Sequence, residues 1–287
     1  MNKPIHRWPL RGWAGLALIA IFWPLNWLLE GPRTHWGFFP LWLGYCLAVD
    51  AVVFFRKGTS LFCRNPSGYV GMYLISALAW WVFEFINWRT ANWIYLGEEH
   101  TGPICFFLLS SLSFSTVIPA VFGTAELVAT FRPIRNMKPS SPLMPTRSLL
   151  AGMFASGWLM LALLLIWPRY FFPLVWLSLF FILEPVNARR GSKTLIGFLA
   201  GGDWRPVVAL STGCLICGFF WEMWNFFSYP RWIYEIPFVG FLKIFEMPIL
   251  GYGGYIPFSW ELFAFYHFIM GLWGRHSSVD FESLRTQ

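Results

Sequence analysis

The chain has 287 residues, of which 57% are hydrophobic and only 12% are charged. Soluble domains carry about 25% charged residues, so this composition excludes an ordinary soluble enzyme and is typical of a membrane protein. The net charge of +7 comes from short basic clusters between apolar runs, which favours loops beside a lipid surface over a nucleic-acid interface. Membrane lipids are therefore the expected partners, and no nucleic-acid partner is expected.

Eight apolar runs are predicted to cross the bilayer as helices, since about 20 apolar residues span its hydrocarbon core and every backbone group there needs an internal partner. In chain order they cover residues 12–29, 36–55, 67–88, 104–130, 148–167, 171–187, 206–227 and 249–273. The predicted fold is an all-α membrane protein built from two tandem repeats. These are a first four-helix repeat at 1–135, a cytoplasmic linker at 136–147 and a second four-helix repeat at 148–287.

Basic residues are unevenly divided between the two sides of this topology. Both chain ends and the loops after the second, fourth and sixth runs hold most of the 21 Lys and Arg residues. Positive charge is retained in the cytoplasm, so both termini are predicted to be cytoplasmic. The expected location is the inner (plasma) membrane of a bacterial cell, and the sequence leaves the oligomeric state open.

The two halves carry the same landmarks in the same order. Each has Phe-Phe-Pro near the start of its second span, a basic pair with glycine after that span, and Glu-x-x-Asn followed by Trp-Ile-Tyr. The matched segments are 38–43 with 171–177, 56–58 with 189–191, 84–87 with 222–225, 93–95 with 232–234 and 118–119 with 256–257. Four spans per half is an even number, so both halves enter from one side as parallel repeats. A substrate or pore is expected between them.

Proline and glycine interrupt the stretch from 228 to 257, which contains four residues of each type. Proline removes a backbone donor and breaks helices, so a regular helix is excluded there. This pattern predicts an interfacial or re-entrant segment before the last span. At that depth, irregular backbone is tolerated only where protein covers it or where it lines a cavity.

Six acids lie in or beside the spans and form three repeat-related pairs. The pairs are Asp50 with Glu184, Glu84 with Glu222, and Glu126 with Glu261. An acid at the centre of a membrane helix costs about 2.5–3.5 kcal/mol, so each is a candidate functional residue. Asp50 and Glu184 lie beside basic pairs, which favours a salt bridge or a helix-end anchor.

Glu84 and Glu222 are each followed three residues later by asparagine, Asn87 and Asn225. This spacing places the two side chains on one helix face, where the amide can donate to the carboxylate or hold a polar group of a substrate. Aromatic neighbours surround both pairs, and such an environment suits a proton donor. The alternative is a polar contact between helices.

Glu126 and Glu261 follow a proline by seven and four residues, which places each acid on roughly the same helix side as that proline. They are therefore expected to face a shared cavity with the first pair. No cofactor or metal is expected, because ExxN lacks the histidine of di-iron helices and Cys214 and Cys217 lie in an apolar run as packed thiols. Tyr and Trp at the span ends are expected to form interfacial belts.

Two resemblances follow from these motifs. The segment Trp221-Glu-Met-Trp-Asn225, with Pro230-Arg-Trp-Ile-Tyr234 and Pro237 after it, resembles a signature of uncharacterised bacterial inner-membrane proteins and implies no activity. The shorter segment from Ile249 to Phe263 resembles the end of the lycopene cyclase domain of bacterial and fungal carotenoid enzymes. In that family an acid pair stands two and three residues after proline, whereas here a single acid stands four residues after it.

Three functions are open at this point. The first is a cyclase-, hydratase- or isomerase-like membrane enzyme acting on an isoprenoid or another lipid. In it Glu222 and Glu261 would be the acid and base, with Glu84 and Glu126 as their counterparts, and aromatic faces would stabilise a developing cation. The second is a proton- or cation-coupled transporter or channel. The third is an accessory subunit whose polar residues hold helices together.

Overall fold

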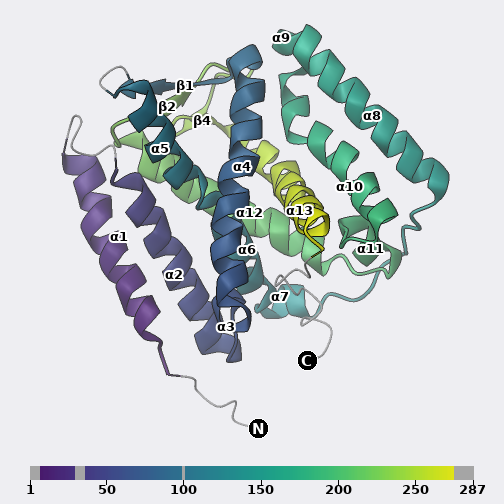
Figure 1. The fold of residues 1–287 in the computed structure, drawn as a ribbon, viewed down its shortest axis with the longest axis horizontal. Coiled ribbons are helices and arrows are strands. Elements are labelled where there is room, and N and C mark those ends of the chain that lie inside the picture. Colours follow the sequence, from purple (N-terminus) through teal and green to yellow (C-terminus); the bar gives the residue numbers. More distant parts are fainter. Residues whose placement is uncertain (1–6, 30–35, 99–100, 275–287) are drawn as a thin grey trace.

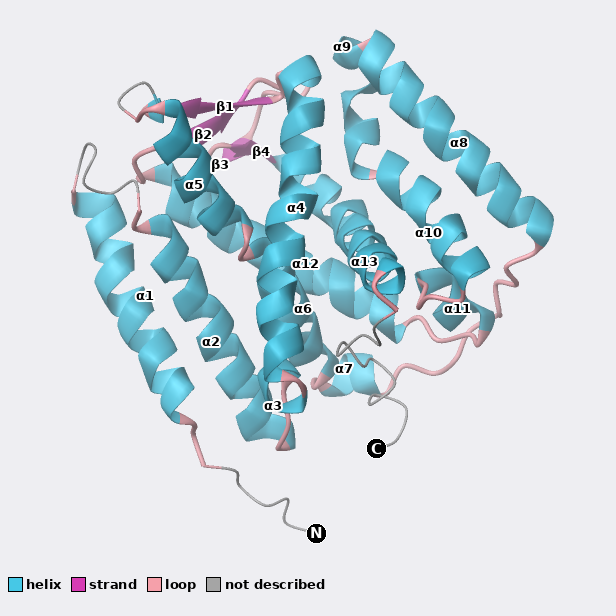
Figure 2. Cartoon of the chain, viewed as in Figure 1, coloured by secondary structure: helices cyan, strands magenta, loops and turns pink. Residues whose placement is uncertain are grey.

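The computed structural model describes residues 7–29, 36–98 and 101–274, and this part of the chain is predominantly helical (Figures 1 and 2). The first half contains α1 (Leu10–Leu28), α2 (Phe38–Lys57), α3 (Leu61–Arg64), α4 (Pro66–Thr90), β1 (Trp93–Leu96), α5 (Pro103–Phe114), α6 (Val117–Ala129) and α7 (Arg132–Arg135). The second half contains α8 (Arg147–Ile166), α9 (Pro168–Phe171), η3 (Phe172–Trp176), α10 (Ser178–Arg190), α11 (Leu195–Ala200), α12 (Arg205–Phe226), β2 (Arg231–Tyr234), β3 (Lys243–Ile244), β4 (Met247–Pro248), η4 (Ile249–Gly254) and α13 (Tyr255–Leu272).

Several helices are long and apolar enough to cross a membrane. In the described part of the chain these are α2, α4, the α5–α6 pair, α8 and α12, with a sixth if the bent segment from α9 to α10 is one span. The helices α1 and α13 have 19 and 18 residues but are not among them. Polar residues lower their hydropathy, such as Glu261 and His267 in α13.

The outer surface of these helices is apolar. Only 11% of the most apolar window of α8 is buried within the protein, and Leu74, Phe85 and Trp88 of α4 are among the most exposed large side chains. Water would make such a surface costly, whereas lipid tails match it. The helices are therefore compatible with an integral membrane protein.

The predicted span at 104–130 corresponds to one apolar segment, Pro103–Ala129, in which a short turn separates two helices. The helix α5 ends at Phe114 and α6 begins at Val117. This start places Pro119 in the first turn of α6, where proline is tolerated because the N–H it lacks would have no helical partner. Ser76 of α4 bridges the break, donating to the Phe114 carbonyl at 2.6 Å and accepting from Ile118 N at 3.0 Å.

The run at 171–187 is not a continuous helix. Pro173 lies in the 3-10 turn η3, and the chain bends by 40° before α10. The last helix begins at Tyr255 rather than at 249, because η4 occupies the residues before it. Both corrections concern proline- and glycine-containing segments, in which the backbone cannot supply a complete helical ladder.

The helix α6 lies at the centre of the bundle, and nearly all its residues are buried. It packs against α2, α4 and α12, and α1 covers α2 on one side of the molecule while α8 covers α10 on the other (Figure 1). The helices α1 and α2 approach closely at Gly15 and Gly44. A Cβ at Gly44 would lie 2.8 Å from the Gly15 carbonyl oxygen, so a larger residue cannot be accommodated without separating the helices.

The strands β1 and β2 come from different halves and pair antiparallel at one end of the bundle (Figure 2). Ile94 lies opposite Ile233, Trp93 opposite Tyr234, and Tyr95 opposite Trp232. The two Trp-Ile-Tyr segments therefore pair with each other about their central isoleucines. This arrangement brings segments 139 positions apart into one small sheet.

We expect Gly44→Val to lower thermal stability by separating α1 from α2. Overpacking a close contact costs about 1–3 kcal/mol. The measurement is the unfolding temperature of the purified protein in detergent. Gly152→Ala is the matched control, since a Cβ at this α8 position meets nothing within 4 Å. Equal unfolding temperatures for both variants would contradict the close packing of α1 on α2.

Candidate functional site

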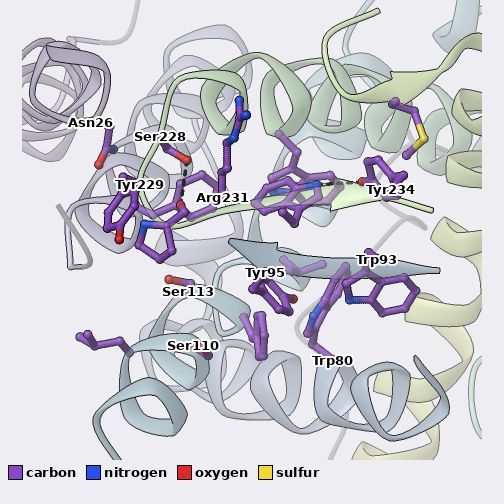
Figure 3. A pocket seen from close by; sticks show the side chains of 18 of the residues that line it. Asn26, Trp80, Trp93, Tyr95, Ser110, Ser113, Ser228, Tyr229, Arg231 and Tyr234 are labelled. Carbon is purple, nitrogen blue, oxygen red and sulfur yellow. Dashed lines mark hydrogen bonds between the residues drawn. The ribbon is translucent and has the colours of Figure 1, made fainter. Parts of the chain in front are cut away.

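A cavity of about 140 Å³ lies between the β1–β2 sheet and the helices α4, α5, α12 and α13 (Figure 3). Its wall is mainly aromatic. The aromatic residues that line it are Phe38, Trp80, Trp93, Tyr95, Phe106, Phe114, Trp176, Trp221, Tyr229, Trp232, Tyr234, Tyr255 and Phe258. Ring faces of this kind bind apolar groups and stabilise cations.

Glu84, near the end of α4, lies directly behind one side of this wall. Its Oε1 atom accepts hydrogen bonds from Trp80 Nε1 at 2.8 Å and from Trp93 Nε1 at 3.1 Å. The Tyr95 hydroxyl donates to the same oxygen. The three donors line the cavity and the carboxylate does not, so the acid contacts the cavity only through them.

Glu222 of α12 has the equivalent position on the other side. Its Oε1 atom accepts from the hydroxyls of Tyr234 at 2.7 Å and Tyr255 at 2.6 Å, and both tyrosines line the cavity. Trp232 Nε1 donates to the Tyr234 hydroxyl at 2.9 Å. The Glu222 side chain is fully buried, and its Oε2 atom has no hydrogen-bond partner among the described residues.

The two strand tyrosines are hydrogen-bond donors at neutral pH. Burial raises the pKa of Tyr95 and of Tyr234 well above the usual value, and the neighbouring carboxylate raises each pKa further. Both hydroxyls therefore keep their protons over the physiological range. Each tyrosine is thus a protonated group that connects a buried carboxyl to the cavity.

Asn87 and Asn225 hold the strands in place. Asn87 Nδ2 donates to the Trp93 carbonyl at 2.8 Å, and its Oδ1 accepts from Trp93 N at 3.3 Å. Asn225 makes the same pair of bonds to Trp232, at 2.7 Å and 2.9 Å. The amides bind the strand backbone rather than the neighbouring carboxylates, so the expected interaction between Glu and Asn of each motif is replaced by a strand anchor.

Glu126 and Glu261 do not line this cavity, so the expectation that they face one cavity together with Glu84 and Glu222 is not met there. Glu126 forms ion pairs with Lys57 at 2.6 Å and with Arg64 at 2.7 Å. Glu261 accepts from Leu179 N at 2.9 Å, at the start of α10. Both acids connect helices instead.

Asp50 and Glu184 anchor the turns that follow their helices. Asp50 pairs with Arg11 at 2.7 Å and accepts from Phe62 N at 3.1 Å. Glu184 accepts from Ile196 N at 2.8 Å. For Asp50, the ion pair agrees with the salt-bridge interpretation of the sequence, although its partner is Arg11 of α1 rather than the adjacent basic pair.

Several cavity residues escaped the sequence analysis. In the sequence, Trp93, Tyr95, Trp232 and Tyr234 served only as landmarks of the repeat. In the structure all four line the cavity, and Trp93, Tyr95 and Tyr234 donate to the buried carboxyl groups. Asn26 of α1 also lines the cavity, and nothing in the sequence marked it. The repeated Trp-Ile-Tyr, placed shortly after each Glu-x-x-Asn, was the available signal for the tyrosines.

Within the described ranges, no three His, Cys, Asp or Glu side chains gather as a group that could hold a metal ion. Cys214 and Cys217 are free and buried in α12. No protein-family model, curated protein or solved structure matches this chain. The cavity and the two carboxyl groups behind its wall are the features of the molecule that bear on its function.

We expect Asn225→Ala to release β2 from the end of α12. Two hydrogen bonds of about 0.5–1.5 kcal/mol each are lost, so amide exchange at 231–234 should accelerate by roughly tenfold or more. Hydrogen–deuterium exchange with mass spectrometry measures this. Asn136→Ala, at an exposed position, is the matched control. Unchanged exchange at 231–234 in Asn225→Ala would show that the amide does not hold the strand.

Proposed function

We propose that this protein is a membrane enzyme that uses Glu84 and Glu222 for acid–base chemistry on an unsaturated lipid of the isoprenoid class. The observation that supports this is the placement of both carboxyl groups behind tyrosine hydroxyls that line one aromatic cavity. A hydroxyl both donates and accepts, so it can pass a proton between a buried carboxyl and a bound molecule.

The proposed first step adds a proton to a carbon–carbon double bond of the lipid. The Tyr234 O–H bond breaks as the new C–H bond forms, and the Glu222 carboxylic acid returns a proton to the tyrosine oxygen. The ring faces of the cavity stabilise the carbocation that results. A proton lost from a neighbouring carbon then passes through Tyr95 to Glu84. One turnover leaves Glu222 ionised and Glu84 protonated, so a proton then returns from Glu84 to Glu222 to restore the starting state. Isomerisation or cyclisation by this route is proton-neutral over the whole cycle and needs no co-reactant.

Hydrogen bonding favours this division of roles. Glu84 accepts three hydrogen bonds on Oε1, which stabilise an ionised carboxylate ready to take a proton. Glu222 accepts two, and its Oε2 atom is buried without a partner in the described part of the chain. Glu222 is therefore assigned as the acid and Glu84 as the base.

We further propose that the halves are tandem repeats, and matched hydrogen bonds support this. Each of Asp50 and Glu184 accepts from the backbone N–H twelve residues later. Ser60 and Thr194 each cap the short helix that follows, accepting from the third residue after themselves. Together with the equivalent asparagine anchors, these contacts relate α2, α3, α4 and β1 of the first half to α10, α11, α12 and β2 of the second. The proposed topology keeps eight spans and both termini in the cytoplasm.

We expect Glu222→Gln to abolish a lipid conversion that the wild type performs. The amide cannot deliver the proton that starts the reaction, and removal of a general acid costs about 10²–10⁴-fold in rate. The measurement is mass spectrometry of lipid extracts from cells that express the wild type, the variant or neither. Glu84→Gln should have a similar effect, because the base is then missing.

Glu235→Gln is the matched control, since this carboxylate is exposed directly after β2. It should retain the wild-type lipid profile. An identical lipid profile with and without well-expressed wild-type protein would contradict the proposed enzymatic activity. Solute flux in liposomes and partner capture would then test the transporter and the accessory subunit.

The topology predicts opposite labelling of two exposed positions. Ser140→Cys, in the linker, should react with a membrane-impermeant maleimide only after the cells are opened. Lys243→Cys, near the cavity end of the bundle, should react on spheroplasts with intact membranes. Both variants are made in a background without Cys63 and Cys105, the two exposed native thiols. Reaction of both positions on the same side would contradict the proposed orientation.

A further inference from the structure

The cavity has a polar end and an aromatic end (Figure 3). Asn26, Ser110, Ser113, Ser228 and Tyr229 lie toward one end, whereas Trp80, Trp93 and Tyr234 lie toward the other. The carboxyl groups of Glu84 and Glu222 accept hydrogen bonds from residues of the aromatic end. A molecule that fills the cavity is therefore polar at one end and apolar where the proposed chemistry takes place.

Asn26 supplies the polar end of the cavity with a hydrogen-bond donor. Its side chain is only 1% exposed, and its Nδ2 donor has no hydrogen-bond partner within the described part of the protein. An unpaired amide in an apolar helix bundle costs about 1–3 kcal/mol. A ligand oxygen that accepts from Nδ2 removes this cost, so the side chain is suited to an acceptor on the bound molecule.

The charge at this end favours an uncharged head group. Arg231 is the only charged side chain among the described residues that line the cavity. Its guanidinium donates to the Phe226 carbonyl at 2.8 Å and pairs with Glu246 at 3.3 Å. With its cation occupied in this way, the wall offers no free positive charge to neutralise a diphosphate or a carboxylate, whose desolvation would be costly.

The size of the cavity limits how much of a lipid it encloses. A dry cavity of about 150 Å³ holds a molecule the size of benzene, and this one measures about 140 Å³. It therefore encloses the polar end of a lipid and the first double bonds next to it. The remainder of a long chain has to lie outside.

We propose that the substrate class is a neutral, oxygen-headed unsaturated lipid, an alcohol or carbonyl compound whose oxygen accepts a hydrogen bond from Asn26 Nδ2. This inference rests on the proposed function, because the head group placed at Asn26 brings the adjacent double bonds to the tyrosines of the aromatic end. Asn26 is a positioning residue for the substrate and carries no proton in the reaction.

The test uses three molecules with the same fifteen-carbon unsaturated chain. Farnesol has a hydroxyl head, farnesyl diphosphate an anionic head and farnesene no polar head. Binding to the purified full chain is followed by tryptophan fluorescence, since Trp80, Trp93, Trp176, Trp221 and Trp232 line the cavity. Farnesol is expected to bind about tenfold more tightly than either of the others, after correction for partition into the detergent.

Asn26→Leu should weaken the binding of farnesol about tenfold, to the affinity of farnesene, and leave the affinity for farnesene unchanged. Asn136→Leu, an exposed position, should change neither. Equal or tighter binding of farnesyl diphosphate by the wild type would overturn the neutral head group, a result that does not depend on any variant folding. An unchanged farnesol affinity in folded Asn26→Leu would overturn the role of Asn26. Absence of binding by all three molecules would instead count against the lipid site itself.

Discussion

A carboxyl group buried in an apolar helix bundle has to find its hydrogen-bond donors inside the protein, because lipid tails and hydrocarbon side chains supply none. Among the described residues, Glu84, Glu184 and Glu261 each take at least one donor from another segment. Glu184 accepts from the start of α11, Glu261 from the start of α10, and Glu84 from side chains of its own helix and β1. The need to satisfy these acids therefore joins segments that hydrophobic packing alone would leave free to slide.

The same requirement produces the site. Glu84 and Glu222 lie near the ends of long helices, and the nearest strong donors are the aromatic hydroxyls and indoles of the following strands. Asn87 and Asn225 hold these strands against the helix ends, and pairing of β1 with β2 sets them side by side. An arrangement that satisfies two buried acids thereby places two protonated tyrosines, from the two halves, on the wall of one cavity.

The other acids show why position within the helix decides the role of a carboxyl group. Glu126 lies near the end of α6 that carries basic neighbours, and Lys57 and Arg64 neutralise it. Asp50 is neutralised by Arg11. Among the described residues, no basic side chain forms an ion pair with Glu84 or Glu222, and aromatic donors surround them instead. Ion-paired acids stabilise the bundle, whereas acids held only by hydroxyl and indole donors remain able to exchange a proton.

The sequence by itself determined the membrane class, most helices and the repeated landmarks, because apolar runs and the spacing of Glu-x-x-Asn and Trp-Ile-Tyr are local properties. It also selected Glu84 and Glu222. It could not show that Glu126 is ion-paired, that 171–187 is bent, or that Tyr95 and Tyr234 point inward, since each depends on what a distant segment presents. Asn26 carries no signal at all in the sequence. Only the tertiary structure places it at the cavity, because α1, β2 and α12 meet there through packing between residues some 200 positions apart, such as Trp27 and Trp224.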